Sequence, residues 1–379
     1  MQDSSQLKLL DLSRAKFPLT HAVLEAGIKQ GVAPGFVGGL WTRKDPDQFY
    51  LTAIGQRRLG PHSLPMLPET VFDIASLSKI FATATLCGVL VDRGWLRWDT
   101  FLSSILSEYP YPQIQIQHLL SHTAGLPAWK PLWESLWKAF APIPIDQVPI
   151  LDRQREMRRL VVSVAPEVEP GQRVLYSDIT FLLLGFALEV ITQMSLDKAV
   201  EHFVWKPMGV SRAYYRPIHN SRSQKWEEVA ATEDDPARGG VLQGQVHDDN
   251  CWAMGGYGGH AGVFTDARNL FQFVRALMGG FLSLPTLSAL WTPVLLPMGA
   301  SRTLGWDMPS GDLPSAGKLF SRRSVGHLGF TGTSLWVDLD AELAVVLLSN
   351  RVHPTRENLK IREFRPQFHE AIRTDVDAL

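Results

Sequence analysis

The stretch FDIASLSKIFATATLCGVLV, residues 72–91, combines the pattern of a buried apolar helix with a charged residue near its start. Ser76 and Lys79 stand there, and no acidic residue between Lys79 and Val91 neutralises the lysine. A charge placed among apolar side chains must be solvated, paired or used, because burying it alone costs a great deal of free energy. The stretch therefore predicts a core helix that begins with a functional side chain.

The spacing of Ser76 and Lys79 puts both side chains on one helix face, about one turn apart. A serine hydroxyl is a poor nucleophile until a base takes its proton, and a lysine whose pKa is lowered by burial can be that base. The start of a helix also offers unpaired N–H groups that can hold an oxyanion. Ser-x-x-Lys alone is a weak signal, since an ordinary first-turn serine with an outward lysine fits the same letters.

Strand patterns lie at both ends of the chain. Residues 35–60 contain two strand-like runs separated by the turn formers KDPDQ, and residues 333–351 contain two more around DLDAE. Residues 5–31 and the segment from Thr355 onward have helical character. This order favours an α+β fold, with an antiparallel sheet made from both chain ends and flanked by helices.

The long middle of the chain reads as a helical insertion. We expect residues 1–75 and 300–379 to form a sheet subdomain and residues 76–299 a mainly helical subdomain. The two would make one catalytic unit, with the active site in the cleft between them.

Composition limits the kinds of partner. The chain has 379 residues, 45% hydrophobic, with a formal net charge of −1. Its densest basic cluster, LDRQREMRRL, is typical of a solvated helix face, so no nucleic-acid partner is predicted. Cys87 and Cys251 fit neither a disulfide framework nor a zinc site. We expect a small-molecule or peptide substrate, and the oligomeric state is left open.

No membrane segment is predicted, since runs such as FLLLGFALEVI are shorter than the roughly 18 residues that a membrane helix needs. The start MQDSSQLKLLDLSRAKF lacks the apolar core of a secretory signal. This favours a cytoplasmic location, or export if a leader has been removed.

Two further groups leave alternatives open. Trp129, Trp133 and Trp137 would share one helix face, packing on the core or forming an aromatic lid over a cleft. A second group, His247, Asp248, Asp249 and His260, invites a metal-site interpretation, but its spacing fits no defensible ligand set, and no metal is predicted.

Six segments carry a resemblance, in order along roughly residues 20–355: FDIASLSK, LLSHTAGLP, PGQRVLYSD, VHDDNCWAMGGYGGHAGVFTDARNLFQF, GHLGFTGTSLWVD and LLSNRVHP. Together they resemble the serine β-lactamase and penicillin-binding protein superfamily, within it the class C-like branch that includes DD-peptidases and carboxylesterases. The resemblance implies a β-lactamase/transpeptidase-like fold and no cofactor. An α/β-hydrolase is disfavoured, because no GxSxG nucleophile elbow is present.

The resemblance implies that Ser76 is the acyl-accepting nucleophile, Lys79 its proton partner and Tyr176 the second acid/base. The family's Tyr-x-Asn element is Tyr-Ser-Asp here, ending in Asp178. An ionised aspartate accepts hydrogen bonds but donates none, so it contacts a substrate amide differently. An Asp178 near Lys79 would also favour the charged ammonium and shift the role of base towards Tyr176.

The resemblance of the segment GHLGFTG also implies the opposite wall of the active site. His327 would bind a substrate carboxylate or shuttle protons, Gly329 would let substrate backbone approach, and the N–H of Phe330 would complete the oxyanion hole with that of Ser76. His327 replaces the lysine of Lys-Thr-Gly, so a fixed positive charge becomes dependent on pH.

The sequence therefore predicts a serine hydrolase that forms an acyl-enzyme at Ser76 on a β-lactam, a D-alanyl peptide or a small ester. The changes at Asp178 and His327 favour an ester or peptide. The alternative is a catalytically silent penicillin-recognising module with a binding or regulatory role.

Overall fold

The computed structural model describes residues 7–215, 226–294 and 302–379. Its main sheet has the strand order β1-β3-β2-β12-β11-β10, and β4 pairs with β3. These strands are β1 (Lys8–Asp11), β2 (Gly35–Thr42), β3 (Gln48–Arg58), β4 (Leu64–Pro65), β10 (Val325–Leu328), β11 (Ser334–Asp338) and β12 (Leu343–Ser349).

The two ends of the chain meet at the centre of this sheet. Strands β2 and β12 run antiparallel, with Phe36 opposite Ser349 and Thr42 opposite Leu343. Both predicted hairpins are present, because β2 pairs with β3 and β11 with β12. The prediction of an antiparallel sheet built from both termini is confirmed.

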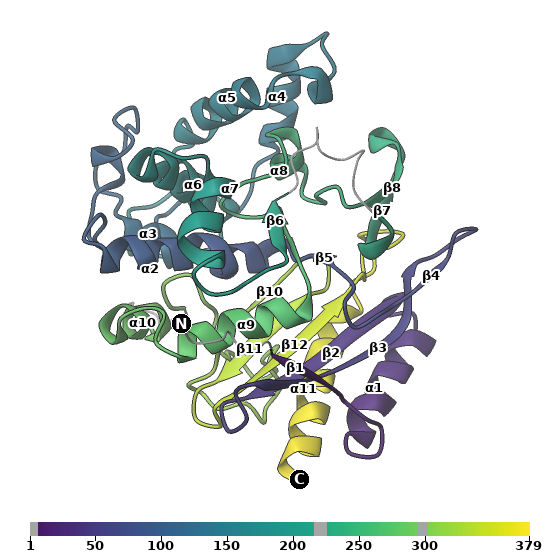
Figure 1. The fold of residues 1–379 in the computed structure, drawn as a ribbon. Helices are drawn as coiled ribbons and strands as arrows, with labels where there is room; N and C mark the ends of the chain where they lie inside the picture. Colours follow the sequence, from purple (N-terminus) through teal and green to yellow (C-terminus); the bar gives the residue numbers. More distant parts are fainter. Residues whose placement is uncertain (1–6, 216–225, 295–301) are drawn as a thin grey trace.

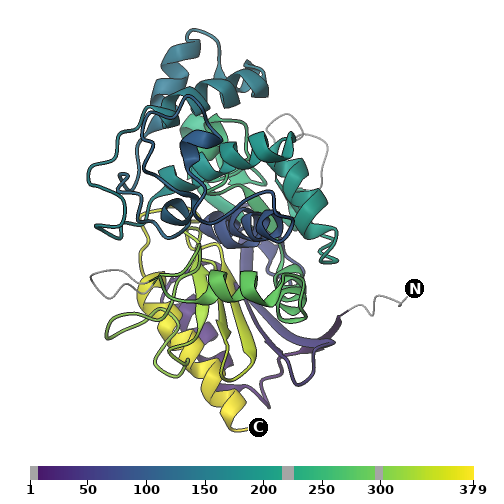
Figure 2. The ribbon, with the colours of Figure 1, turned by 90° about the vertical axis from the view of Figure 1, so that its left-hand side faces the viewer.

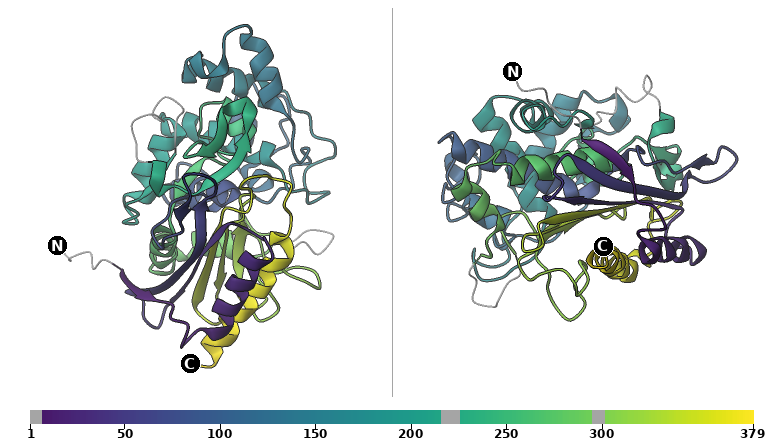
Figure 3. Two further views of the ribbon diagram at one scale, coloured as in Figure 1. Left: turned by 90° about the vertical axis from the view of Figure 1, so that its right-hand side faces the viewer. Right: turned by 60° about the horizontal axis from the view of Figure 1, so that its bottom comes forward.

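Helices cover both faces of the sheet (Figure 1, Figure 3). Helices α1 (Pro18–Lys29) and α11 (Ile361–Asp377) pack together on one face, and α9 (Ala267–Met278) packs on the other. Neighbouring glycines of β2 make room for them: a Cβ on Gly38 would meet Phe368 of α11 at 2.9 Å, and one on Gly39 would meet Phe271 of α9 at 2.9 Å. Side chains alternate across a strand, so two successive glycines admit one aromatic ring on each face.

The N-terminal segment differs from the prediction of one helix over residues 5–31. Residues 5 and 6 lie outside the described residues, and Lys8–Asp11 form β1, which pairs in parallel with β3. The helix begins only at Pro18, a residue whose fixed φ suits the first helical position. It ends, as predicted, before Gly31, whose φ is +65°. The predicted C-terminal helix likewise starts later than Thr355, at Ile361.

The rest of the chain lies above the sheet in the view of Figure 1, and Figure 2 gives the side view. Its helices are α2 (Thr85–Asp92), α3 (Ile116–Leu120), α4 (Leu132–Phe140), α5 (Ile150–Val162), α6 (Asp178–Thr192), α7 (Leu196–Val200), α8 (Asp249–Ala253) and α10 (Leu284–Trp291). Five short strands accompany them, namely β5 (Phe72–Asp73), β6 (Ala213–Tyr215), β7 (Ala231–Asp235), β8 (Gly240–Gln243) and β9 (Val263–Thr265). They pair as β5-β9-β6 and β7-β8.

The apolar stretch that carries Ser76 and Lys79 lies in the core of this upper part. Within the described residues, Ala75–Asp92 is long and apolar enough to cross a membrane, but 83% of it is buried inside the protein. The bent pair Asp178–Thr192 and Leu196–Trp205 passes the same test only if taken as one span. A core helix of a folded domain has the same length and composition. On α5, the predicted solvated arginine face needs one correction, because Arg153 is fully buried.

Candidate active site

Ser76 sits on a tight, irregular connection between β5 and α2. Residues Ala75–Leu77 form a short 3-10 turn, and a π-helical turn, Lys79–Ala84, leads into α2. Ala75 has a φ of +47°, a left-handed conformation that costs free energy in a residue with a side chain. The Asp73 carboxylate holds this conformation by accepting a hydrogen bond from the N–H of Ala75 at 2.9 Å. The backbone strain therefore falls on the residue directly before the predicted nucleophile.

Lys79 is fully buried and donates three hydrogen bonds. Its Nζ lies 3.0 Å from Ser76 Oγ, 2.7 Å from Asp178 Oδ1 and 3.0 Å from the carbonyl oxygen of His260. Burial alone would lower the pKa of the ammonium, but Asp178 and Tyr176 outweigh burial and the pKa is raised. The lowered lysine pKa expected from Ser-x-x-Lys alone is therefore wrong, and the effect expected of Asp178 is present.

Asp178 reaches Lys79 because it is the first residue of α6. Its backbone N–H donates to the carbonyl oxygen of Ala128 at 2.9 Å, which fixes the start of the helix. The carboxylate is 18% exposed and faces the same cavity as Ser76. The ammonium of Lys79, which is out of water, thus has an opposite charge 2.7 Å away.

Tyr176 lies between two cations. Its ring centroid is 4.9 Å from Lys79 Nζ and 5.2 Å from the guanidinium carbon of Arg302. Desolvation raises the pKa of the phenol, while the charge of Lys79 and hydrogen bonds with Lys79 and Ser76 oppose that rise. The net direction is upward, so the resting hydroxyl is protonated. The ring of His122 packs against that of Tyr176, with the two ring centroids 4.6 Å apart.

His122 is a buried residue whose importance the sequence analysis missed, although LLSHTAGLP was one of the six segments. Its φ is +57°, and its Nδ1 accepts a hydrogen bond from the N–H of Ser177 at 3.1 Å. Burial and the nearby Arg302 hold its pKa well below the usual range, so the ring is neutral. His122 thus anchors the backbone next to Tyr176.

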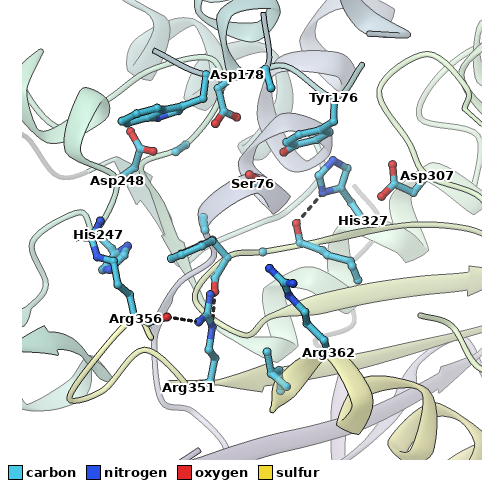
Figure 4. Close-up of a pocket in the computed structure, with 18 of the residues that line it drawn as sticks. Ser76, Tyr176, Asp178, His247, Asp248, Asp307, His327, Arg351, Arg356 and Arg362 are labelled. Carbon is cyan, nitrogen blue, oxygen red and sulfur yellow. Dashed lines mark hydrogen bonds between the residues drawn. The ribbon is translucent and has the colours of Figure 1, made fainter. Parts of the chain in front are cut away.

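His327 stands opposite Ser76 on β10 (Figure 4). Its Nδ1–H donates to the carbonyl oxygen of Leu328 at 2.8 Å, and its Nε2 has no hydrogen-bond partner among the described residues. Burial, Lys79 and Arg302 hold the pKa of His327 well below 6.5. The expectation of a histidine whose charge changes near neutral pH is therefore wrong. Arg302, which pairs with Asp307, lines the same cavity as His327.

Gly329 has a structural reason to be glycine. A Cβ there would lie 2.0 Å from Thr333 Oγ1 and 2.5 Å from the carbonyl oxygen of Ile74. The hydroxyls of Thr331 and Thr333 donate to the carbonyl oxygens of Asp73 and Ile74. The turn after β10 is thus fastened to the segment that carries Ser76, and Gly329 permits this approach. Its expected role towards substrate backbone stays a prediction.

Phe330 and Ser76 line the same cavity, which has a volume of about 620 Å³. The Phe330 side chain is 48% exposed and lies between the ring of His247, at 5.6 Å, and the guanidinium of Arg351, at 4.2 Å. Shared placement in one cavity is compatible with an oxyanion hole formed by the two backbone N–H groups.

The other end of the cavity is basic, which the sequence analysis did not anticipate. Figure 4 shows Arg351, Arg356 and Arg362 below Ser76 in the view, and Arg365 lines the same space. Arg356 pairs with Glu233 and Asp249. Arg362 is exposed, and no ion pair within the described ranges involves it. These side chains come from the C-terminal segment, far from Ser76 in sequence.

The tryptophans of residues 128–140 divide between the two predicted roles. Trp129 precedes α4, is 47% exposed and lines the cavity. Trp133 and Trp137 lie on α4, with ring centroids 4.8 Å apart, and pack against the core. A face shared by all three was expected only if the whole stretch were helical, and the helix begins at Leu132, after Trp129.

The residues considered for a metal site have other partners. His260 bonds Asp248 at 2.9 Å, and His247 bonds Glu233 at 3.0 Å. Over residues 7–215, 226–294 and 302–379, no cluster of three or more His, Cys, Asp or Glu side chains could hold a metal ion.

Comparisons with known proteins show the family of this chain. A family model described as Beta-lactamase matches residues 22–368. A protein of Escherichia coli O157:H7 named "Putative D-alanyl-D-alanine carboxypeptidase" is 28% identical over 365 residues, which cover 87% of this chain and 82% of that protein.

Solved structures show the fold. "EstCE1, a hydrolase with promiscuous acyltransferase activity" superposes with a TM-score of 0.74 at 20% identity, covering 95% of this chain and all (100%) of the other. D-amino acid amidase from Ochrobactrum anthropi SV3 has a TM-score of 0.70 at 18% identity, covering 95% and 99%. With a family model matching most of its length, the chain belongs to the β-lactamase family and is a serine hydrolase.

Proposed function

We propose that this hydrolase works through an acyl-enzyme at Ser76 and acts on an ester or a peptide. The observation that carries the proposal is the contact of Ser76 Oγ with the buried Lys79, 3.0 Å away, inside a cavity of about 620 Å³. Ser76 Oγ attacks the carbonyl carbon of the substrate, its proton passes to the base, and the oxyanion is held by the N–H groups of Ser76 and Phe330.

The base in this proposal is the phenolate form of Tyr176. Lys79 keeps its proton beside Asp178, so it serves as a cation that orients Ser76 and favours the phenolate rather than as the proton acceptor. The proton taken from Ser76 then passes from Tyr176 to the leaving alcohol or amine. In the second half, Tyr176 takes a proton from water and the resulting hydroxide attacks the carbonyl carbon of the acyl group. The ester bond to Ser76 then breaks, a carboxylic acid leaves, and Tyr176 returns its proton to Ser76 Oγ.

A substrate with a carboxylate fits the basic end of the cavity. Arg362 is exposed there, while Arg351 and Arg365 donate to backbone carbonyl oxygens that hold the wall in place. A guanidinium binds a carboxylate in a fixed, bidentate geometry. The relative named "Putative D-alanyl-D-alanine carboxypeptidase" bears the name of an activity on chains that end in such a group. A peptide ending in a free carboxylate, or an ester carrying one, is thus the favoured substrate class.

The test compares a chromogenic cephalosporin, a D-alanyl-D-alanine peptide and a short p-nitrophenyl ester, each with the wild type and with Ser76→Ala. We expect turnover of the ester or peptide and its loss in Ser76→Ala, with an unchanged unfolding transition. Ser78→Ala is the matched control, because Ser78 Oγ accepts a bond from the N–H of Val263 and does not line the cavity.

A serine-reactive phosphonate gives an independent readout. Labelling of the wild type and of Ser78→Ala, but not of Ser76→Ala, is expected. Turnover that survives Ser76→Ala would contradict the nucleophile. Absence of both turnover and labelling in the wild type would favour the silent binding module instead.

A further inference from the structure

A second cavity adjoins the catalytic one. It has a volume of about 370 Å³ and shares Asp249 and Arg356 with the wall of the catalytic cavity. These two side chains form an ion pair of 3.0 Å, so the partition between the cavities is made of side chains rather than backbone. We call the second cavity the tryptophan chamber, after Trp133, Trp137 and Trp252 in its lining.

The aromatic wall of the chamber is continuous. Trp137 meets Trp133 edge to face at 4.8 Å and Trp252 at 5.8 Å. The guanidinium of Arg238 lies over the ring of Trp252, 4.5 Å from its centroid. Cations are attracted to the faces of tryptophan rings by the ring quadrupole. One cation of the protein itself, Arg238, therefore already lies against this wall. Trp133 and Trp137 remain partly exposed.

The charge of the lining is not balanced. Arg356 and Arg238 pair with the carboxylates of Glu233 and Asp249. Asp234 and Asp235 also line the chamber, and neither is in an ion pair within the described part of the chain.

The two remaining carboxylates differ in what holds them. Asp235 accepts a bond from the N–H of Ala237, whereas Asp234 is exposed. The lining of the chamber thus combines these two carboxylates with three tryptophans.

We propose that the tryptophan chamber binds an organic ammonium group carried by the substrate, at a distance from the bond that Ser76 attacks. This rests on the proposed function and adds a specificity to it. The rings of Trp133 and Trp137 contact the alkylated cation, and Asp234 supplies the counter-charge. A metal ion fits this lining poorly, because hard cations take several oxygen ligands and gain little from indole rings.

The binding test uses choline and its uncharged isostere 3,3-dimethyl-1-butanol on the Ser76→Ala protein, measured by calorimetry. We expect choline to bind and the alcohol to bind about tenfold more weakly or not at all. Adding Asp234→Asn, or Trp137→Leu, to Ser76→Ala should weaken choline by about tenfold and leave the alcohol unchanged. Glu134→Gln is the matched control: Glu134 lies on α4 between the two tryptophans, is exposed and does not line the chamber.

The kinetic test uses p-nitrophenyl esters of ω-trimethylammonio alkanoic acids, in a series of increasing chain length, beside the matching ω-tert-butyl esters. One chain length should show a preference for the cation in kcat/KM, which Asp234→Asn removes and Glu134→Gln retains. Equal kcat/KM values at every length, or choline binding that Asp234→Asn and Trp137→Leu leave unchanged, would overturn the chamber's role.

The two tests separate this inference from the proposed function. Esters that turn over without any cation preference would leave the acyl-enzyme intact and remove the ammonium site. If choline binds in the chamber but Ser76 of the wild type is never acylated, the ammonium site stands and the acyl-enzyme proposal falls.

Discussion

Lys79 Nζ lies closer to Asp178 Oδ1, at 2.7 Å, than to Ser76 Oγ, at 3.0 Å. The shorter contact joins opposite charges, and Lys79 is fully buried. Charge-assisted hydrogen bonds are stronger than neutral ones, so the contact with the Asp178 carboxylate favours the charged ammonium form of Lys79. In the proposed mechanism, the identity of residue 178 therefore decides whether Lys79 acts as a base or as a fixed cation.

Asp178→Asn tests this directly. Without the carboxylate, burial dominates and the pKa of Lys79 falls, so neutral lysine becomes available at lower pH. We expect the rising limb of kcat/KM against pH to move to lower pH. Unfolding in urea should show a loss of about 1–3 kcal/mol, since asparagine keeps one oxygen acceptor for the buried lysine. An unmoved pH limb would contradict the assignment of Lys79 as a fixed cation.

Tyr176→Phe removes the proposed base while leaving the contacts of Lys79 with Ser76 and Asp178 in place. Because the pKa of Tyr176 is raised, the phenolate fraction grows tenfold with each pH unit through the neutral range, and wild-type kcat/KM should rise with it. The variant should lose about 10²–10⁴ in kcat/KM and show a flat profile. Measuring kcat/KM across pH for both proteins checks this, and a variant that retains the wild-type limb would exclude Tyr176.

A carboxylate-bearing ester tests the basic end of the cavity. The pKa of His327 lies well below 6.5, so its charge does not change between about pH 6 and pH 8, and KM should be constant over that range. Arg362→Met should raise KM for this ester by about tenfold, the size of one charged contact, and leave a neutral analogue unaffected. A KM that rises with pH would restore the charge switch that the sequence suggested for His327.

His369 couples the stability of the sheet layer to pH. It is a fully buried residue of α11, its Nε2 lies 3.1 Å from Ser334 Oγ, and burial followed by Arg365 lowers its pKa to about 3. In the unfolded chain, His369 takes up a proton below about pH 6.5, whereas in the folded protein it stays neutral down to about pH 3. Its contribution to folding stability is therefore complete above about pH 6.5 and is lost as pH falls towards 3. Between these limits the free energy of unfolding should drop by roughly 1.4 kcal/mol per pH unit from this residue.

Urea unfolding at several pH values measures that slope. His369→Gln should flatten it, and His62→Gln, a change of an exposed histidine, should not. An equal slope in wild type and His369→Gln would show that other groups carry the acid sensitivity.

The fold was predictable where local patterns carry it. Alternating strands around KDPDQ and DLDAE mark the hairpins, and the apolar run after Ser76 marks the core helix. Strand β1 was missed because Lys8–Asp11 owes its conformation to pairing with β3, a partner some forty residues away by its register with Gln48. Tertiary pairing of this kind leaves little trace in a short segment.

The site was predictable only in part, for the same reason. Ser76, Lys79, Tyr176 and His327 stand in recognisable segments, and the structure brings them to one cavity or its edge. The protonation of His327 was misjudged, and that of Lys79 was expected only through Asp178, because the pKa of each depends on charges from other elements. Arg302 and Arg362 belong to no motif, and only their placement in space relates them to Ser76.

The pairing of β2 with β12 has a consequence for how the protein is made. Residues that are neighbours at the centre of the sheet, such as Phe36 and Ser349, enter the growing chain at opposite ends of synthesis. Loop closure over such a separation is slow, and contacts of this range delay folding. The first strands therefore stay without their central partner, with apolar faces uncovered, until β12 has been synthesised. Exposed apolar surface of this kind makes a growing chain prone to aggregation until that strand pairs.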